Sequence, residues 1–245
     1  MTDWFVDWFN SDIYLSLYKH RNDNDARALT DLICGEVEVH KNPTALDLAC
    51  GAGRHSLLFA KKGFTVTGID LSENLLAKAK ERAVSNNANI EFIQSDLRTL
   101  KLNRTFDVTL SLFTSFGYFE SRSANFVLLG IAYNHTKPGG YFVLDFFNPE
   151  FLKQNLVPIS EHIVDGYEIV QKRSIVNDRV VKKIVVSSGT KTWQFSESVQ
   201  MFSAAELTAG LESVGFQVQK VFGGYGGERF SESFSERILI ISKRI

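Results

Sequence analysis

The chain has 245 residues, which is long enough for one α/β domain with an insertion and a large buried core. Hydrophobic residues make up 44% of it and charged residues 22%, a composition that excludes wholesale disorder. The 27 basic and 28 acidic side chains leave a net charge of -1, so no global field favours nucleic acid or an anionic membrane. Small or neutral substrates are therefore favoured.

The cysteines and the N-terminal residues exclude further classes. Neither Cys34 nor Cys50 lies in a CxxC motif or a Cys/His cluster, so the sequence predicts neither a disulfide framework nor a metal site. The first twenty residues are aromatic and acidic, unlike a signal peptide, and no apolar run approaches membrane-spanning length. We therefore expect a cytoplasmic protein without a membrane partner.

The N-terminal segment is rich in aromatic residues. Between Asp3 and Tyr18 they recur, with leucines, at three- and four-residue steps, which predicts short amphipathic helices. Helical spacing from Asp25 to Val39 predicts a further helix. Residues 1–40 would then form a helical cap, which either only covers the domain or also closes over a ligand with its tyrosine hydroxyls pointing inward.

A strand, a glycine turn, a helix and a second strand follow. The first strand is predicted from Thr44 to Leu48, and the turn is the sequence DLACGAGRH over 47–55, whose two glycines allow a sharp bend and a close approach to a ligand. A helix is predicted from Arg54 to Lys62, ended by Gly63, and a β-branched strand from Phe64 to Asp70. Between strand and helix, the turn would present N-terminal helix amides to a polar ligand.

Strands and helices continue to alternate up to residue 148. The predicted elements are a helix from Ser72 to Asn86, strands from Ile90 to Gln94 and from Phe106 to Leu112, a helix from Ser123 to His135, a Pro138-Gly139-Gly140 turn, and a strand from Tyr141 to Phe146. This alternation predicts a parallel sheet, which binds ligands beyond the carboxyl ends of its strands. Four polar residues fall at or just past those ends and are expected at one sheet edge: Asp47, Asp70, Asp96 and Ser111.

The pattern changes after residue 149. Three β-rich runs, with Asn177-Asp178 and Ser188-Gly189 turns between them, predict an antiparallel meander: Ile159 to Arg173, Arg179 to Ser187, and Thr192 to Met201. A helix through Val214 then begins at a capping box of Ser203 and Glu206. Two further strands, Phe216 to Phe222 and Arg237 to Ser242, complete the first sheet.

The fold expected for residues 1–245 is therefore a single α/β domain. It has a Rossmann-like, mostly parallel seven-stranded sheet with helices on both faces, an N-terminal helical lid over residues 1–40, and an antiparallel β insertion over residues 150–201.

The residues beside the sheet edge narrow the ligand. Ser56 occupies the position of the third glycine in the dinucleotide fingerprint, so a nicotinamide or flavin site is disfavoured. Asp70, at the end of the second strand, can accept hydrogen bonds from a ribose diol and would repel a 2′-phosphate. Asp96, after the third strand, can accept from an adenine amine. These features favour an adenosine-bearing ligand without a pyrophosphate.

At these motifs the sequence resembles the class I S-adenosylmethionine-dependent methyltransferases, especially those that act on small molecules. DLACGAGRH, GIDLS and QSDLR match the family's first three motifs, with Ala49 where the family often has glycine. The resemblance covers about residues 40–148 and returns over 202–244. It implies S-adenosylmethionine as cofactor, S-adenosylhomocysteine as product and a small-molecule methyl acceptor. Asp70 would hold the ribose, and Asp96 the adenine amine.

The resemblance also implies roles for residues around these acids. The turn and lid would surround the cofactor, with Leu71 and Leu97 near the adenine, Gly51, Gly53 and Arg54 around the methionine portion beside Asp47 and Ala49, Ser111 and Leu112 near the sulfonium, Ser115 at the carboxylate, and Tyr14 and Tyr18 closing the site. Positioning alone can suffice for transfer from a sulfonium. The candidates for a base or orienting group are Tyr118, His20 and His135.

The acceptor is expected between the lid, the loop from Phe113 to Phe119 and the β insertion. The insertion has two other interpretations, simple coverage of the sheet or formation of a homodimer. Two rival functions also stay open at this stage: a non-catalytic cofactor-binding regulatory domain, and a nucleic-acid methyltransferase, which would need a basic surface near the same loop.

Overall fold

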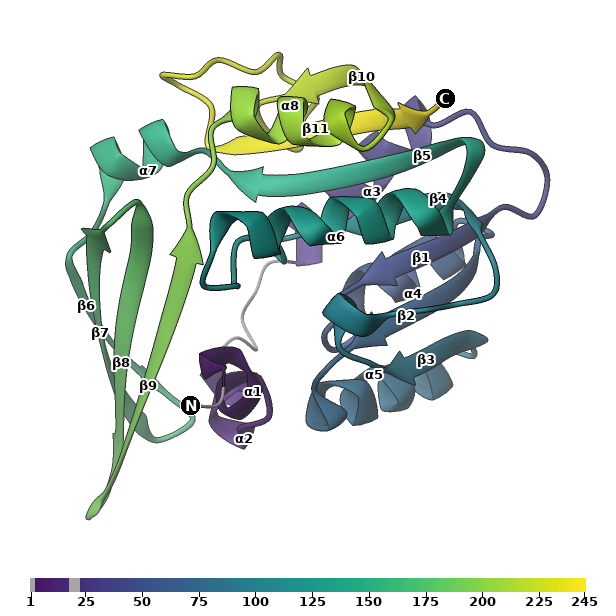
Figure 1. The fold of residues 1–245 in the computed structure, drawn as a ribbon. Helices are drawn as coiled ribbons and strands as arrows, with labels where there is room; N and C mark the ends of the chain where they lie inside the picture. The colour runs from purple at the N-terminus through teal and green to yellow at the C-terminus, as the bar shows by residue number, and fades with distance from the viewer. Residues whose placement is uncertain (1–2, 18–22) are drawn as a thin grey trace.

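The computed structural model describes residues 3–17 and 23–245, which form two sheets with helices around the larger one (Figure 1). The larger sheet has seven strands in the order β10-β11-β5-β4-β1-β2-β3, and the smaller has four in the order β6-β7-β8-β9. In the larger sheet the strands from β3 to β5 are parallel, and β11 is antiparallel to both of its neighbours. The predicted fold class is confirmed.

The strands and helices have the following bounds. The larger sheet contains β1 (Thr44–Leu48), β2 (Thr65–Asp70), β3 (Ile90–Gln94), β4 (Phe106–Ser111), β5 (Thr136–Phe147), β10 (Phe216–Phe222) and β11 (Arg237–Arg244). The smaller contains β6 (Ile159–Val164), β7 (Tyr167–Val176), β8 (Arg179–Ser188) and β9 (Lys191–Gln200). The helices are α1 (Trp4–Phe9), α2 (Asp12–Leu17), α3 (Asp23–Glu36), α4 (Arg54–Lys61), α5 (Glu73–Ser85), the 3₁₀ helix η1 (Leu97–Thr99), α6 (Arg122–His135), α7 (Pro149–Asn155) and α8 (Ala204–Ser213).

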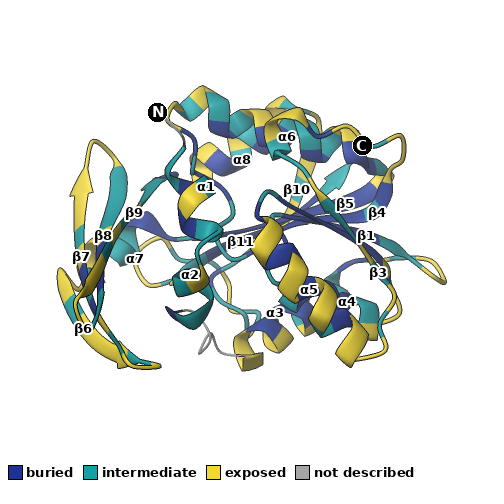
Figure 2. Cartoon of the chain, turned by 90° about the horizontal axis from the view of Figure 1, so that it is seen from below, coloured by how far each residue is buried: buried dark blue, intermediate teal, exposed yellow. Residues whose placement is uncertain are grey.

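Two hydrophobic cores lie on opposite faces of the larger sheet. Alternate residues of β1 point to opposite faces, so Leu46 and Leu48 pack with α6 and α8 on one face, while Ala45 packs with α3 and α4 on the other. The inner strands β1, β4, β5 and β11 of the larger sheet are mostly buried, whereas the smaller sheet exposes much of its outer surface (Figure 2). Within the described residues, no helix is long and apolar enough to span a membrane.

The strand β5 begins five residues before the predicted one. Thr136 pairs with Phe106 and Tyr141 pairs with Val108, so the predicted Pro138-Gly139-Gly140 turn is instead an irregularity inside the paired strand. Gly140 is required there, since a Cβ would lie 2.8 Å from the Asp107 carbonyl oxygen.

The structure also corrects the prediction for the insertion. The expected run from Ile159 to Arg173 is two strands, β6 and β7, because Asp165 and Gly166 both adopt positive φ and make a tight hairpin turn. The helix α7 was not predicted, although Asn148 caps it by accepting from the Glu150 amide and Pro149 occupies its first position.

Two helical glycines provide a matched test of the packing between α6 and α8. A Cβ on Gly210 would lie 2.3 Å from the Phe126 ring, whereas a Cβ on Gly130 would meet no atom within 4 Å. Gly210→Ala should therefore destabilise the fold by about 1 to 3 kcal/mol through overpacking. Gly130→Ala should stabilise it by about 0.5 to 1 kcal/mol through helix propensity. Urea unfolding measures both, and equal effects would contradict the packing.

Candidate active site

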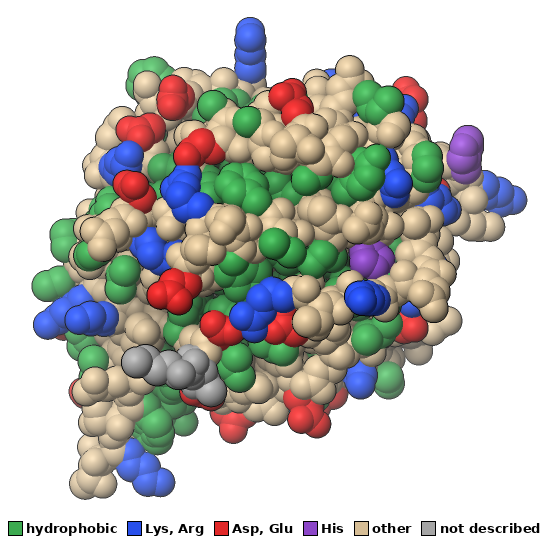
Figure 3. All heavy atoms as spheres, viewed as in Figure 1, with side chains coloured by type: hydrophobic (Ala, Val, Ile, Leu, Met, Phe, Trp, Pro, Cys, Tyr) green, Lys and Arg blue, Asp and Glu red, His purple; other side chains and the backbone are tan. Residues whose placement is uncertain are grey.

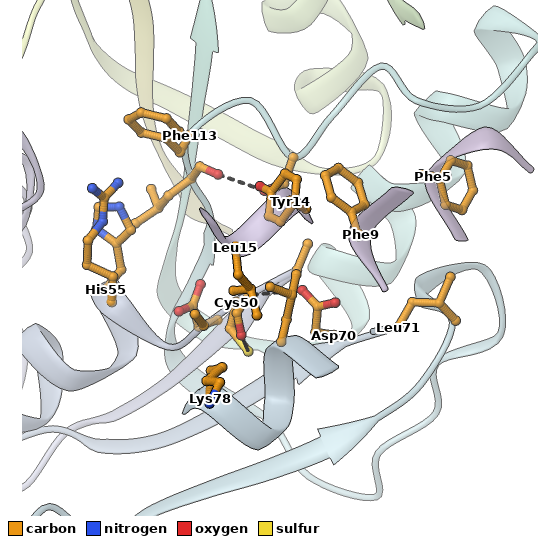
Figure 4. A pocket seen from close by; sticks show the side chains of 18 of the residues that line it. Phe5, Phe9, Tyr14, Leu15, Cys50, His55, Asp70, Leu71, Lys78 and Phe113 are labelled. Atoms are coloured by element: carbon orange, nitrogen blue, oxygen red, sulfur yellow. Dashed lines mark hydrogen bonds between the residues drawn. The ribbon is translucent and has the colours of Figure 1, made fainter. Parts of the chain in front are cut away.

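A cavity of about 690 Å³ lies beyond the carboxyl ends of the parallel strands. Segments distant in sequence line it, among them the helices α1 and α2, the glycine turn after β1, the carboxyl ends of β2 and β3, the helix α5 and the loop after β4 (Figure 4). Parallel strands bring their carboxyl ends to one edge, which is where such a sheet binds ligands. The structure therefore brings most of the sequence-predicted residues together.

The predicted residues divide into three groups. Those that line the cavity are Tyr14, Asp47, Ala49, Gly51, Arg54, Asp70, Leu71, Asp96, Leu97, Leu112, Ser115 and Tyr118. Those that are described but lie outside the lining are Gly53, Ser111 and His135. Tyr18 and His20 lie outside the described residues.

The three that lie outside the lining have structural environments of their own. Gly53 adopts φ +70° at the start of α4, and a Cβ there would lie 2.9 Å from Ala79, so it permits close packing on α5. Ser111 is buried at the end of β4, paired with Leu144. His135 accepts from the Leu102 amide through Nε2 and donates to the Ile131 carbonyl through Nδ1.

Asp70 holds the glycine turn in place. Its two carboxylate oxygens accept the amides of Gly51 at 2.7 Å and Ser72 at 2.8 Å. The turn needs this support because Ala49, a non-glycine residue, adopts φ +55° beside Gly51 at +57°. Burial raises the pKa of Asp70, while the amides partly oppose that rise. Each oxygen keeps a second lone pair that can accept from a ligand.

Asp47 explains the serine in the glycine turn. Ser56 donates its hydroxyl to Asp47 at 2.6 Å and also contributes its backbone amide. The carboxyl group thereby caps the first turn of α4 from the end of β1. Burial nevertheless raises its pKa to about 7, since the ionised form is poorly solvated. The sequence showed Ser56 only as the residue that replaces the third glycine of the dinucleotide fingerprint. In the structure it is the hydrogen-bonding partner of Asp47.

The raised pKa of Asp47 predicts a pH-dependent stability. Between the unfolded value of 3.8 and about 7, the folded state keeps a proton that the unfolded state has lost, so stability falls as pH rises. Relative to Asp47→Asn, which cannot ionise, the wild type should lose about 2 kcal/mol of unfolding free energy between pH 5 and pH 7. Urea unfolding of both proteins at the two pH values measures this, and parallel pH profiles would contradict it.

Asp96 is tied to the N-terminal helix by an arginine. Arg98 donates to both carboxylate oxygens of Asp96, at 3.0 and 2.6 Å, and pairs with Asp3 at 2.8 Å. The same guanidinium lies over the rings of Phe5 and Phe119. Hydrogen bonds from Arg98 hold the pKa of Asp96 below its usual value, so the carboxylate stays charged. The third acid and the lid are therefore connected.

The smaller sheet supports the lid from outside. Trp8 of α1 packs on Phe195 of β9 with ring centroids 4.5 Å apart, and its indole donates to Glu197 at 2.9 Å. Ser72, which caps α5, donates its hydroxyl to the Phe9 carbonyl at 2.9 Å. The lid is therefore held between the insertion and the edge of the larger sheet.

Sequence reasoning missed His55. The sequence interpretation made it a helix residue beside the turn, yet its ring lines the cavity (Figure 4). The side chain is buried, and neither ring nitrogen has a hydrogen-bond partner among the residues that the structure describes. Burial, and then the charge of Arg54, lower its pKa to about 3, so the ring is neutral. A neutral imidazole offers one donor and one acceptor, and leaving both unpaired is costly, so the ring is suited to a ligand.

The known proteins to which this chain is similar are methyltransferases. A family model described as "Methyltransferase domain" matches residues 45–140. A dTDP-3-amino-3,4,6-trideoxy-alpha-D-glucopyranose N,N-dimethyltransferase from Streptomyces venezuelae is 26% identical, over 89% of this chain and 94% of its own. A cypemycin N-terminal methyltransferase from a Streptomyces species is 28% identical, over 82% and 83%.

Solved structures share the fold. An S-adenosylmethionine-dependent methyltransferase from Clostridium acetobutylicum aligns with a TM-score of 0.81 at 21% identity, covering 95% of this chain and 96% of its own. DesVI from Streptomyces venezuelae aligns with a TM-score of 0.70 at 25% identity, covering 96% and 98%. The chain matches the methyltransferase family model over residues 45–140 and shares the fold of S-adenosylmethionine-dependent methyltransferases, which supports the family that the sequence motifs predicted. It is an enzyme of methyl transfer.

Proposed function

We propose that the cavity binds S-adenosylmethionine along the sheet edge and that the enzyme methylates a small-molecule acceptor, leaving S-adenosylhomocysteine. The observation that carries this proposal is the placement of Asp70, Asp96 and the glycine turn in the wall of one cavity beneath an aromatic lid. Asp70 ends β2, Asp96 follows the neighbouring strand β3, and the imidazole of His55 lies toward the other end of the cavity.

The proposed cofactor orientation follows from these walls. The adenine would lie among Leu71, Leu97 and Phe5, with its amine near Asp96. Asp70 would accept from the ribose hydroxyls through its remaining lone pairs, while its other lone pairs hold the turn. The methionine portion would then extend past Gly51 and Leu112 toward Arg54.

A bound sulfonium supplies an already activated methyl group, so the protein mainly has to align the acceptor and exclude water. Displacement in line with the sulfur–methyl bond then needs an acceptor that enters from the lid side. Tyr118 is suited to orient the acceptor or hold the acceptor's proton, because it lines the cavity. Its ring is held by Trp4, with the two ring centroids 5.2 Å apart. His20, the second residue proposed for this role, is untested by the described structure.

Two observations favour a small acceptor over nucleic acid. Arg179, beside the loop after β4, donates to the carbonyls of Phe119 and Ser198 inside the protein. On the face shown in Figure 3, acidic and basic side chains are interspersed rather than separated by sign. The name of one Streptomyces relative, an N,N-dimethyltransferase, places the methyl groups on nitrogen, and the name of the other places methylation at the N-terminus of cypemycin. Both support amines as the first acceptors to assay.

Calorimetry with S-adenosylhomocysteine tests the ribose role of Asp70. Asp70→Asn should weaken binding by about 1 to 3 kcal/mol, because a charged acceptor is lost. Asp31→Asn is the matched control, since Asp31 is exposed and pairs with Lys62 on the surface. Equal affinity of the Asp70 variant and the wild type would reject the assignment, and no binding to the wild type at millimolar ligand would reject the proposed cofactor seat.

A second ligand tests whether His55 contacts the amino-acid end. S-adenosylhomocysteine has that end, and 5′-deoxy-5′-methylthioadenosine lacks it. His55→Ala should weaken binding of the first by about 1 to 2 kcal/mol, through the loss of a buried hydrogen bond, and leave the second nearly unchanged. His162→Ala, in the exposed strand β6, should affect neither ligand. Equal loss for both ligands would show that His55 only supports the turn.

A further inference from the structure

A buried carboxylate lies behind the wall of the cavity. Asp145 of β5 is 0% exposed and receives the Phe113 amide at 2.8 Å, the Tyr225 hydroxyl at 2.9 Å and the Arg237 Nε at 2.9 Å. We call Asp145, Tyr225 and Arg237 the Asp145 cluster. None of the three lines the cavity, so the group acts on the site only through other residues.

The cluster holds two consecutive residues in the left-handed conformation. Phe113 has φ +57° and Thr114 has φ +63°, although a β-branched residue such as threonine is a true outlier there. In this region the Cβ of an L-residue lies too close to the following carbonyl oxygen, so both conformations are strained. The Thr114 amide donates to the Asp145 carbonyl at 3.0 Å, and its hydroxyl accepts from Arg237 at 3.1 Å. Such backbone persists only where surrounding contacts determine it.

The ring of Phe113 connects this cluster to the glycine turn. The Arg54 guanidinium lies 5.0 Å from the ring centroid and that of Arg237 lies 5.8 Å from it. Phe113 and Arg54 both line the cavity. Contacts therefore connect Arg237 at the start of β11, through Phe113 in the loop after β4, to Arg54, the first residue of α4.

The cluster is more than a link between two strands. β5 and β11 are already joined by a ladder from Arg237 opposite Phe147 to Lys243 opposite Tyr141. A buried ion pair adds little stability over a hydrophobic pair, because both charges lose their hydration. Burial and the charge of Asp145 raise the pKa of Tyr225, which keeps its hydroxyl a donor. Several bonds of the cluster go to the loop after β4, which the strand ladder does not hold.

We propose that Arg237 and Asp145 are positioning residues for methyl transfer. They hold the backbone at Phe113 in a conformation that it would not keep alone, and so fix the cavity wall beside Arg54. This inference rests on the proposed cofactor seat, because the wall acts on whatever that seat holds.

Combining Arg237→Gln with Thr114→Gly distinguishes a positioning role of Arg237 from a role in stability alone. Arg237→Gln should weaken binding of S-adenosylhomocysteine at least tenfold, because the strained backbone is released. Thr114→Gly removes the steric strain at that residue. In the double variant it should restore the affinity to within about threefold of the Thr114→Gly single variant. A merely structural arginine would show no such rescue.

Arg244→Gln is the matched control on the same strand. Arg244 donates to the carbonyls of Tyr133 and Thr136 at the far end of β11, so its loss should lower the melting temperature and leave affinity within twofold. If Arg237→Gln does not fold, Tyr225→Phe removes one donor to Asp145 with less damage and should weaken binding about threefold, with the same glycine rescue. Unchanged affinity in the folded variant, or no rescue, would overturn the proposal.

A ligand-free measurement keeps this test separate from the proposed function. Hydrogen–deuterium exchange over residues 110–118 should rise in Arg237→Gln, return toward the wild-type level with Thr114→Gly, and stay unchanged in Arg244→Gln. If the wild type binds no S-adenosylhomocysteine but the variants show this exchange pattern, the proposed cofactor seat is wrong. The inference that the Asp145 cluster holds the loop after β4 is then still supported. If exchange over residues 110–118 does not change in Arg237→Gln, the inference that the Asp145 cluster holds the loop is wrong.

Discussion

The carboxylate of Asp70 is the point on which the site depends. One oxygen accepts from Gly51 in the glycine turn and the other from Ser72 at the start of α5. Ser72 in turn donates to the Phe9 carbonyl of the lid. A single side chain at the end of β2 therefore joins the turn, the neighbouring helix and the cover of the cavity.

The acids at the strand ends are held at a cost to stability. Asp47 and Asp70 are almost fully buried, and burial raises the pKa of both. Backbone amides and the Ser56 hydroxyl offset part of the lost hydration, but within the described residues no cationic side chain pairs with either carboxylate. When both are ionised, such a pair creates a negative potential at the sheet edge, which favours a cationic ligand over a neutral one. Burial of these two acids therefore lowers the stability of the folded state and prepares the sheet edge for a cationic ligand.

Local patterns were sufficient to predict most of the fold and the acids of the site. Asp47 and Asp70 lie at the carboxyl ends of strands with a visible apolar sequence and Asp96 follows another, so their common edge follows from the parallel sheet. The capping box at Ser203 was equally local, and the structure confirms it. The Asp165-Gly166 hairpin and the Asn148 cap also had local signals that the sequence interpretation passed over.

What the sequence could not predict depends on contacts between distant residues. The unpaired ring of His55, the bond from Arg98 to Asp3 and the cluster around Asp145 join segments whose approach no periodicity encodes. Gly53 also has a distant neighbour that the sequence did not reveal. It was assigned to the ligand because it lies in the motif, but a Cβ at this position would lie against Ala79 of α5.

The attachment of the lid to the smaller sheet separates two tasks of one active site. Under the proposed function, the glycine turn and its acids, which belong to the larger sheet, would contact the methyl donor. The cover rests on β9, through Trp8 and Phe195, and this strand belongs to a module inserted between β5 and α8. Changes in that module would then alter the entrance for the acceptor and leave the proposed cofactor seat in place, so that one scaffold could serve different acceptors with the same methyl donor.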